Sequence, residues 1–429
     1  MSVEPLSILI LGAVFLIATV GHIHMGALAI AAAFVLGMCV LPGDVDAKVD
    51  QIAGGFPGDL FVVLAGVTYL FAIAKNNGTV DWLVQAALRS VRGRVALVPW
   101  VMFLVAAAAT AVGAVAPAMV AMLAPVGIAF ALRHRRSPVL VGLMIVNGAS
   151  AGSFSPIGVF GSITNSVVER NGLEGSPTML FVTCFLFNVL LGVIAVALFG
   201  GQTRAVRPGV GVAAADAEAA TAGDAAPPVP TLNLHRTLTI VGLLVLATGA
   251  LLFDLDVGFS AFVLAVLLSA VDPAGAKGAI NQIAWSTVLL VCGIVTYVSL
   301  MQTLGAIDYL GGSVAAIGAA VAGALAICYI GGLVSAFAST TGILGALIPL
   351  AVPFLQRQDV SAIGVIAALA ISASAVDSSP FSTSGSLVVA NAPEEERELV
   401  YRRFLQWGFS MVALAPVTAW LLLVVSGWF

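Results

Sequence analysis

Two stretches of the chain repeat each other and decide its fold. Residues 148–162 read GASAGSFSPIGVFGS, and residues 372–386 read SASAVDSSPFSTSGS. When the two stretches are aligned without gaps, seven of the 15 positions are identical, and they include the Ser-Pro pairs at 155–156 and 379–380. Each stretch interrupts a long apolar segment with small and polar residues. The pattern predicts two helices that are broken in the same way.

The composition excludes a water-soluble enzyme. Of 429 residues, 60% are apolar and only 9% are charged, whereas soluble proteins carry about 25% charged residues. The small net charge of −4 indicates no nucleic-acid partner. All cysteines lie inside apolar runs, which is typical of small core residues and not of disulfides or a metal cluster: Cys39, Cys184, Cys292 and Cys328. The chain is therefore predicted to be an all-α protein that crosses the membrane many times.

The apolar segments predict ten full spans and two re-entrant hairpins. A spanning helix needs about 20 apolar residues, and two segments, 96–131 and 313–356, are too long for one span. The broken segments are 138–168 and 361–391. The predicted unbroken spans are 5–21, 25–41, 59–75, 178–200, 236–253, 258–271, 286–304 and 404–428. Residues 201–235, rich in Ala, Gly and Pro, are predicted to be a disordered linker between two halves.

The basic residues predict the orientation. If both over-long segments are hairpins, 14 of the 17 basic residues fall on one side, and only Lys48, Arg170 and Arg357 fall opposite. An excess of Lys and Arg marks the cytoplasmic side. The linker is then cytoplasmic and both termini are periplasmic, in a cell inner (plasma) membrane.

The two halves are predicted to be inverted repeats. Each contains five spans, an odd number, so the second half must be upside down relative to the first. Upstream of the broken segments the repeat continues: Gly66, Gly78 and Asp81 correspond to Gly293, Gly305 and Asp308. Inverted repeats with paired broken helices point to a secondary transporter whose site lies at mid-membrane.

The breaks predict an anion site without basic side chains. Proline is favoured at the first position of a helix, so Pro156 and Pro380 are expected to begin the second half-helices, whose free N–H groups attract anions. The hairpins break near Gly113 and at residues 335–342. We expect these residues at the substrate: Thr110, Gly113, Pro117, Ser153, Ser155, Pro156, Ser339, Thr340, Thr341, Ser379, Pro380, Ser382 and Thr383. The alternative is that such small residues only permit kinks and close packing.

Asp377 is the sharpest single candidate for coupling. An acidic residue at membrane depth is costly and usually functional; here it could bind a cation or take up a proton, or it could cap the following half-helix. Hydroxyl and main-chain oxygens suit an alkali cation. The residues expected at the coupling cation, a candidate Na⁺, are Ser150, Ser335, Ser339, Ser374, Asp377 and Ser378. No other cofactor is expected.

A hydrolase is the weaker alternative. Residues 148–152 match a nucleophile motif around Ser150. A hydrolase needs a base, however, and all histidines lie at span ends or in loops: His22, His24, His134 and His235.

Three stretches carry a family resemblance: GFPGDLFVVLAGVTYLFAIAKNNGTVDWLV (55–84), RGRVALVPWVMF (92–103) and GASAGSFSPIGVFGSITNSVV (148–168). They resemble the malonate/dicarboxylate carrier family of the MatC type, a branch of the ion transporter superfamily related to divalent-anion:sodium symporters. The resemblance implies an elevator transporter, usually a homodimer joined through its scaffold. The scaffold would comprise residues 1–95 and 236–312, and the moving transport part would comprise 96–200 and 313–429.

The resemblance also implies Ser-Asn-Thr signatures at both hairpin tips, which build two sodium sites. The second tip matches in part, through Ser339, Thr340 and Thr341. The first tip departs, because residues 113–116 read Gly-Ala-Val-Ala. One family sodium site is therefore not matched, and Asp377 is the residue that can compensate.

The predicted function is the import of small dicarboxylates, malonate or a C4 acid, coupled to a cation, with Na⁺ favoured over H⁺. Two alternatives stay open. One is a sodium/proton antiporter with Asp377 as the exchanging carboxylate, and the other is a passive anion channel that uses the same helix dipoles.

Overall fold

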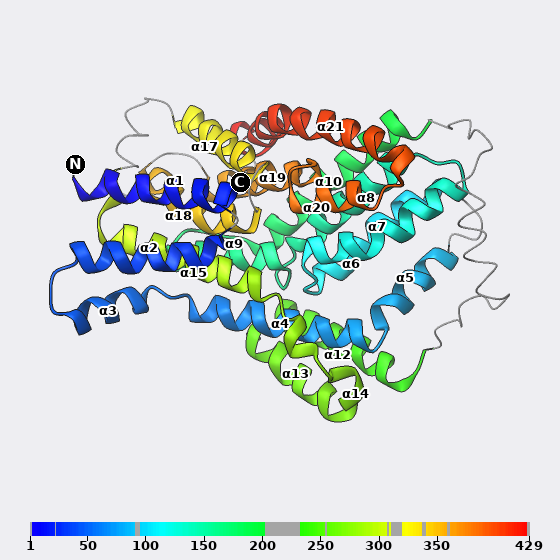
Figure 1. Ribbon diagram of the computed structural model, residues 1–429, viewed down its shortest axis with the longest axis horizontal. Helices are drawn as coiled ribbons and strands as arrows, with labels where there is room; N and C mark the ends of the chain where they lie inside the picture. Colours follow the sequence, from blue (N-terminus) through cyan, green and yellow to red (C-terminus); the bar gives the residue numbers. More distant parts are fainter. Residues whose placement is uncertain are drawn as a thin grey trace.

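The computed structural model describes residues 2–21, 23–90, 95–201, 232–253, 255–306, 309, 320–336, 340–357 and 361–426. Within these ranges all regular elements are helices (Figure 1), so the predicted all-α class is confirmed. The predicted linker falls largely outside the described residues, as do Ser339, Asp308 and His22.

The first half contains α1 (Val3–Gly21), α2 (Met25–Val40), α3 (Val45–Gly54), α4 (Gly58–Asn76), α5 (Thr79–Ser90), η1 (Val95–Leu97), α6 (Val98–Ala111), α7 (Ala116–Arg133), α8 (Pro138–Ser153), α9 (Val159–Arg170) and α10 (Pro177–Phe199).

The second half contains α12 (Leu234–Leu252), α13 (Val257–Val271), α14 (Pro273–Ala276), η2 (Ala279–Gln282), α15 (Trp285–Thr303), α17 (Ala320–Ser335), α18 (Thr340–Arg357), α19 (Ala362–Ala375), η3 (Val376–Ser378), α20 (Thr383–Ala390) and α21 (Glu394–Trp420), which a π-turn extends to Val425.

Several of these helices have the dimensions of membrane spans. Six described segments are long and apolar enough to cross a membrane by length and composition: Gly58–Asn76, Ala116–Arg133, Pro177–Phe199, Trp285–Thr303, Ala362–Ala390 and Glu394–Val425. Shorter apolar helices, among them α1, α2, α12 and α13, occupy other predicted spans. Both over-long segments are helical hairpins, α6–α7 and α17–α18, as predicted.

The repeat is visible in the helix boundaries. In the scaffold alignment, which pairs Gly58 with Trp285, helices α4 and α15 coincide from their first residues to their last, Asn76 and Thr303. In the broken-helix alignment, which pairs residue 148 with residue 372, helices α7 and α18 likewise begin and end together. The turn glycines that follow α4 and α15, Gly78 and Gly305, share a left-handed φ of 74°.

The packing of the central helices follows the same symmetry. Helix α2 crosses α15 while α13 crosses α4, and in each crossing a glycine leaves no room for a Cβ. Gly26 lies against the main chain of Leu289–Leu290, and Gly258 lies against that of Val62–Val63. Small residues let two backbones approach closely in a membrane protein. The scaffold alignment pairs 62–63 with 289–290, so the two crossings are copies.

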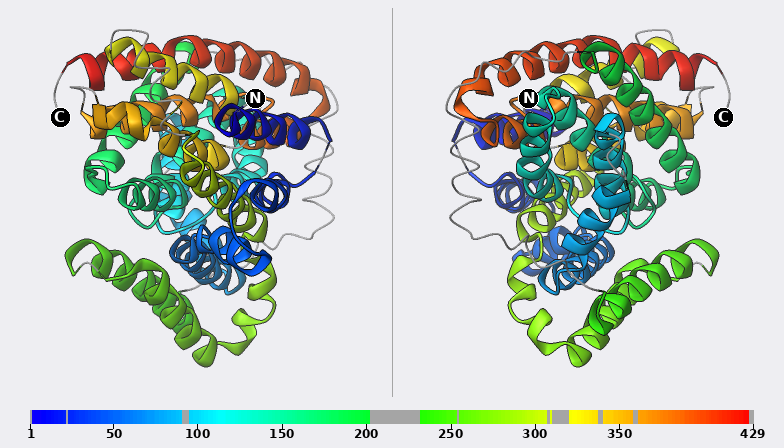
Figure 2. Two further views of the ribbon diagram at one scale, coloured as in Figure 1. Left: turned by 90° about the vertical axis from the view of Figure 1, so that its left-hand side faces the viewer. Right: turned by 90° about the vertical axis from the view of Figure 1, so that its right-hand side faces the viewer.

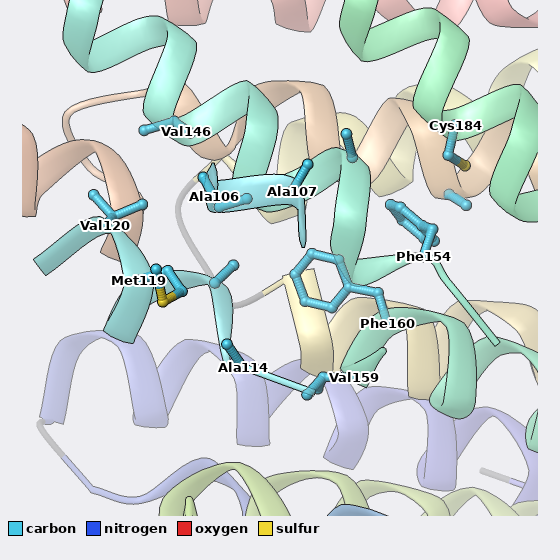
Figure 3. Close-up of a cluster of buried hydrophobic side chains, with 14 of the residues drawn as sticks. Ala106, Ala107, Ala114, Met119, Val120, Val146, Phe154, Val159, Phe160 and Cys184 are labelled. Atoms are coloured by element: carbon cyan, nitrogen blue, oxygen red, sulfur yellow. The ribbon is translucent and has the colours of Figure 1, made fainter. Parts of the chain in front are cut away.

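The breaks lie at the ends of the most buried helices. Every residue of α8 is buried, because α6, α7 and α10 surround it. Figure 3 shows apolar side chains around its end, where Phe154 lies beside Phe160 with ring centroids 5.3 Å apart. Helices α12 and α13, by contrast, project from the body (Figure 2) and expose large apolar side chains such as Leu244, Phe253 and Phe259.

Candidate functional site: two hairpin tips and two broken helices

The two breaks have one geometry. Helix α9 begins at Val159 and α20 begins at Thr383, which are partners in the broken-helix alignment. In each turn a serine carbonyl accepts a hydrogen bond from the N–H of the residue just before the helix. Ser155 accepts from Gly158 at 2.9 Å, and Ser379 accepts from Ser382 at 3.0 Å. The predicted repeat of broken helices is therefore confirmed, and the two turns share the same main-chain hydrogen bond.

The prediction that proline begins each half-helix is wrong. Pro156 and Pro380 lie inside the turns, three residues before the helices start. Proline suits a turn as well as a first helical position, because both use its fixed φ and neither needs its N–H. The residues that do precede the helices are Gly158 and Ser382.

The two helix starts differ in what they offer an anion. At α20, the Oγ of Ser382 accepts from the N–H of Gly385 at 3.1 Å, while its hydroxyl faces the carbonyl oxygens of Asp377 and Ser379. At α9, Gly158 supplies no side-chain cap. Thr383 is exposed, whereas Val159 is buried.

A buried cluster of oxygens joins the second hairpin tip to the second break. The Oγ of Ser335 donates to the carbonyl of Ala373 at 2.7 Å and lies 2.8 Å from the Oγ1 of Thr340. Thr340 Oγ1 in turn lies 2.5 Å from Oδ1 of Asp377. The exposed fractions of Ser335, Thr340 and Asp377 are 0%, 3% and 7%. Two residues predicted for coupling, Ser335 and Asp377, therefore converge on one predicted for the substrate.

This cluster has more short contacts than protons to fill them. Each hydroxyl carries one proton, and a carbonyl or an ionised carboxylate carries none. Ser335 and Thr340 supply two protons for three contacts of 2.8 Å or less. A proton on Asp377, or a cation held between the oxygens, would complete the arrangement and offset the buried negative charge.

The first tip and break, which lie wholly within the described range 95–201, form no such cluster. The broken-helix alignment places Ala111, Ala116 and Ser153 where the second unit has Ser335, Thr340 and Asp377. Ser153 Oγ donates back to Ala149 at 2.8 Å. Tip and break are joined here by the hydroxyl of Ser155, which donates to the carbonyl of Ala111 at 2.5 Å.

The other predicted residues are placed as follows. Thr110 Oγ1 donates to Ala106 at 2.9 Å within α6, and Gly113 forms the tip with a left-handed φ of 107°. Pro117 lies in the first turn of α7 and Thr341 in that of α18. Ser150 and Ser374 are buried on α8 and α19, and Ser378 Oγ donates to Ala375 at 3.1 Å.

Two groups were missed by reasoning from the sequence. One is the carbonyl of Ala373, which no side-chain pattern can reveal. The other is Asn147 on α8, which is 2% exposed and whose Nδ2 has no partner among the described residues. The sequence did offer a signal for Asn147, because it is a lone amide in an apolar run. Buried polar groups are nearly always paired, so such an amide indicates a hydrogen-bond partner or a ligand nearby.

Within the described ranges, no three His, Cys, Asp or Glu side chains gather as a metal site. His24, which directly precedes α2, contacts Ser286 through Nε2, 3.0 Å from its Oγ.

Inverted halves, hairpins and paired breaks define the class of the protein, a multi-pass membrane transporter. Residues 1–153 match the family model of the dicarboxylate carrier protein MatC N-terminus, and residues 243–428 match the citrate transporter family model. The resemblance to the MatC-type carriers is therefore confirmed for the first part of the chain, while the last part matches a second family of the same broad class.

A solved structure shares the fold. The YdaH transporter of Alcanivorax borkumensis, described as having an unusual topology, superposes with a TM-score of 0.60 at 15% identity, and the match covers 90% of each chain. No curated protein matched the sequence.

Proposed function

We propose that this chain imports small dicarboxylates, malonate or a C4 acid, and couples the import to a cation by an elevator motion. Na⁺ is favoured over H⁺ as the coupling ion. Carboxylate substrates are supported by the two family models, one for a dicarboxylate carrier and one for citrate transporters. The membrane would be the bacterial-type inner membrane, with a homodimer formed through the scaffold.

The observation that carries the coupling is the oxygen cluster of Ser335, Thr340, Ala373 and Asp377. It links a hairpin tip to a helix break, the two elements that must meet around a bound ion. A hydroxyl, a carbonyl and a carboxylate are hard oxygen ligands of the kind that Na⁺ uses. A cation held there would neutralise Asp377 and tie the tip to the break.

The substrate carboxylates would bind near the turns of the breaks. No basic side chain is available in the broken segments 138–168 and 361–391, so main-chain N–H groups at the starts of α9 and α20 would hold the negative charge. A bound cation beside Asp377 would lower the repulsion between this aspartate and a dianionic substrate. Ion binding and substrate binding would therefore favour each other.

Uptake of radiolabelled malonate or succinate by proteoliposomes tests the proposal. We expect accumulation above equilibrium when a Na⁺ gradient is imposed. The rate should depend hyperbolically on Na⁺, because the described residues form a single oxygen cluster of this kind. Accumulation with an H⁺ gradient alone would assign the proton as the coupling ion.

The two alternatives give different results in the same vesicles. Uptake that never exceeds equilibrium would indicate a passive channel. Exchange of Na⁺ for H⁺ that does not depend on dicarboxylate would indicate an antiporter. Either result would overturn the proposed function.

A further inference from the structure

The C-terminal end of α9, in the predicted transport part, forms side-chain contacts with both central scaffold helices, α4 and α15. Arg170, the last residue of α9, forms a two-pronged salt bridge with Asp59 in the first turn of α4: Nε donates to Oδ2 at 3.0 Å, and Nη2 contacts Oδ1. The next residue, Asn171, accepts from Nε2 of Gln302 in the last turn of α15, at 2.5 Å.

The packing of the two repeats against the scaffold is unequal. Helix α9 packs on α4 and helix α18 packs on α15. Their repeat counterparts are α20 and α7, and in the described part of the chain neither makes comparable packing with α15 or α4. The beginning of α20 is accordingly open, with Thr383 and Ser386 exposed, whereas Val159 and Phe160 of α9 are buried.

From this inequality we infer that the structure is one of two alternative docked states, and that its contacts at α9 act as a latch. In an inverted repeat, exchanging the positions of the two halves gives the opposite-facing state. By the predicted orientation, α9 and α18 close the periplasmic end. The inference rests on the proposed elevator motion, and it is independent of which substrate or ion is carried.

The repeat also identifies the latch of the other state. The scaffold alignment pairs Gln302 with Lys75, in the last turn of α4. Asn171 corresponds to Asn391 in its role, because each is the C-cap of its half-helix and bonds through Nδ2 to the carbonyl four residues back, at 2.7 and 2.8 Å. Because α20 is four residues shorter than α9, the gap-free alignment pairs Asn171 with Glu395, one turn further along the chain. In the alternative state Lys75 takes the place of Gln302 and contacts Asn391.

The charges near Lys75 fit this role. Two exposed acidic residues, Glu394 and Glu395, follow Asn391 at the start of α21. Among the described residues, Lys75 has no ion-pair partner in the present state. When α20 docks, this ammonium group would meet an amide oxygen and two carboxylates.

Both latches must be weak if the protein is to cycle. Asp59 and Arg170 side chains are 49% and 34% exposed, and exposed ion pairs are screened and contribute little. Removing the pair should therefore shift the balance of states by only about 1.4- to 5-fold.

Disulfide trapping in membrane vesicles tests the inference on the full chain, with the exposed Cys39 replaced by serine. The first pair is Asp59→Cys with Arg170→Cys, and the second is Lys75→Cys with Asn391→Cys. Asp59→Cys with Asn391→Cys, at opposite ends, is the control pair. Cross-linking is measured after oxidation as the fraction of cysteine thiols that no longer react with a maleimide-polyethylene glycol reagent. The measurement needs no transported substrate.

We expect both test pairs to cross-link above the control, and in a chain carrying all four cysteines the first cross-link should prevent the second. In the chain that carries Lys75→Cys and Asn391→Cys, Arg170→Ala should increase the rate of cross-linking of this second pair about 1.4- to 5-fold. In the same chain, exchange of the charges by Asp59→Arg with Arg170→Asp should return the rate to its original value. A second pair that stays at the control level while uptake is active would overturn the latch. If both pairs cross-link but no dicarboxylate is taken up, the latch stands and the proposed substrate falls.

Discussion

The second hairpin and broken helix correspond to the first, helix by helix, yet the two units differ in chemistry, most sharply at three places. Where the second unit has Ser335, Thr340 and Asp377, the first has two alanines and Ser153. The backbones agree down to the turn hydrogen bonds of the breaks. The comparison teaches that the repeat fixes where helices break, whereas a few substitutions decide which break carries the buried oxygen cluster.

Asp377→Asn should have the largest effect and should abolish uphill uptake. The amide reproduces the size of the carboxyl group and can donate to Thr340, so it mimics a neutralised site without a removable charge. We expect accumulation against a gradient to be lost while exchange of labelled for unlabelled dicarboxylate persists. Ser372→Ala, a change of a buried hydroxyl on α19, the helix just before Asp377, is the matched control. Undiminished accumulation by Asp377→Asn would remove this residue from coupling.

Thr340→Val should weaken cation binding without removing the charge. The variant keeps the shape of the side chain but deletes the hydroxyl that lies 2.5 Å from Asp377. A hydrogen bond to a charged group contributes about 1.5–3 kcal/mol, so the half-saturating Na⁺ concentration should rise at least tenfold. Thr296→Val removes a buried hydroxyl bonded to Cys292 on α15 and should leave that concentration unchanged. Equal behaviour of both variants would contradict a role for Thr340.

Gly161→Ala and Gly385→Ala should destabilise the protein to similar degrees, because this feature is shared by both units. A Cβ at either position would overlap the carbonyl oxygen of the turn serine, Ser155 or Ser379. Overpacking of this kind costs about 1–3 kcal/mol. Thermal denaturation in detergent measures it, and Gly12→Ala, with open space around its Cβ, is the control. A large difference between the two variants would break the equivalence of the turns.

Much of this fold could be predicted from the sequence, since it follows from length and hydropathy. The hairpins, the breaks and the inverted repeat each have a linear signature. The first residues of α9 and α20 could not be predicted, because proline suits both a turn and the first position of a helix. Pro156 and Pro380 lie in turns, three residues before these helices begin. The oxygen cluster was predicted only in part: its hydroxyls and carboxylate are side chains, whereas the carbonyl of Ala373 is revealed by no sequence pattern.

Ser155→Ala should have the smallest effect and should sharpen the difference between the two units. The hydroxyl of Ser155 donates to the carbonyl of Ala111 at 2.5 Å and so ties the first tip to the first break. Its counterpart Ser379 accepts from the N–H of Phe381 at 3.3 Å. Loss of a neutral hydrogen bond costs about 0.5–1.5 kcal/mol, and the geometry of the Ser379 bond is the poorer one. Ser155→Ala should therefore lower the denaturation temperature more than Ser379→Ala does. The reverse order would contradict this comparison of the two serines and would mean that the bond from Ser155 to Ala111 contributes less to stability than the contacts of Ser379.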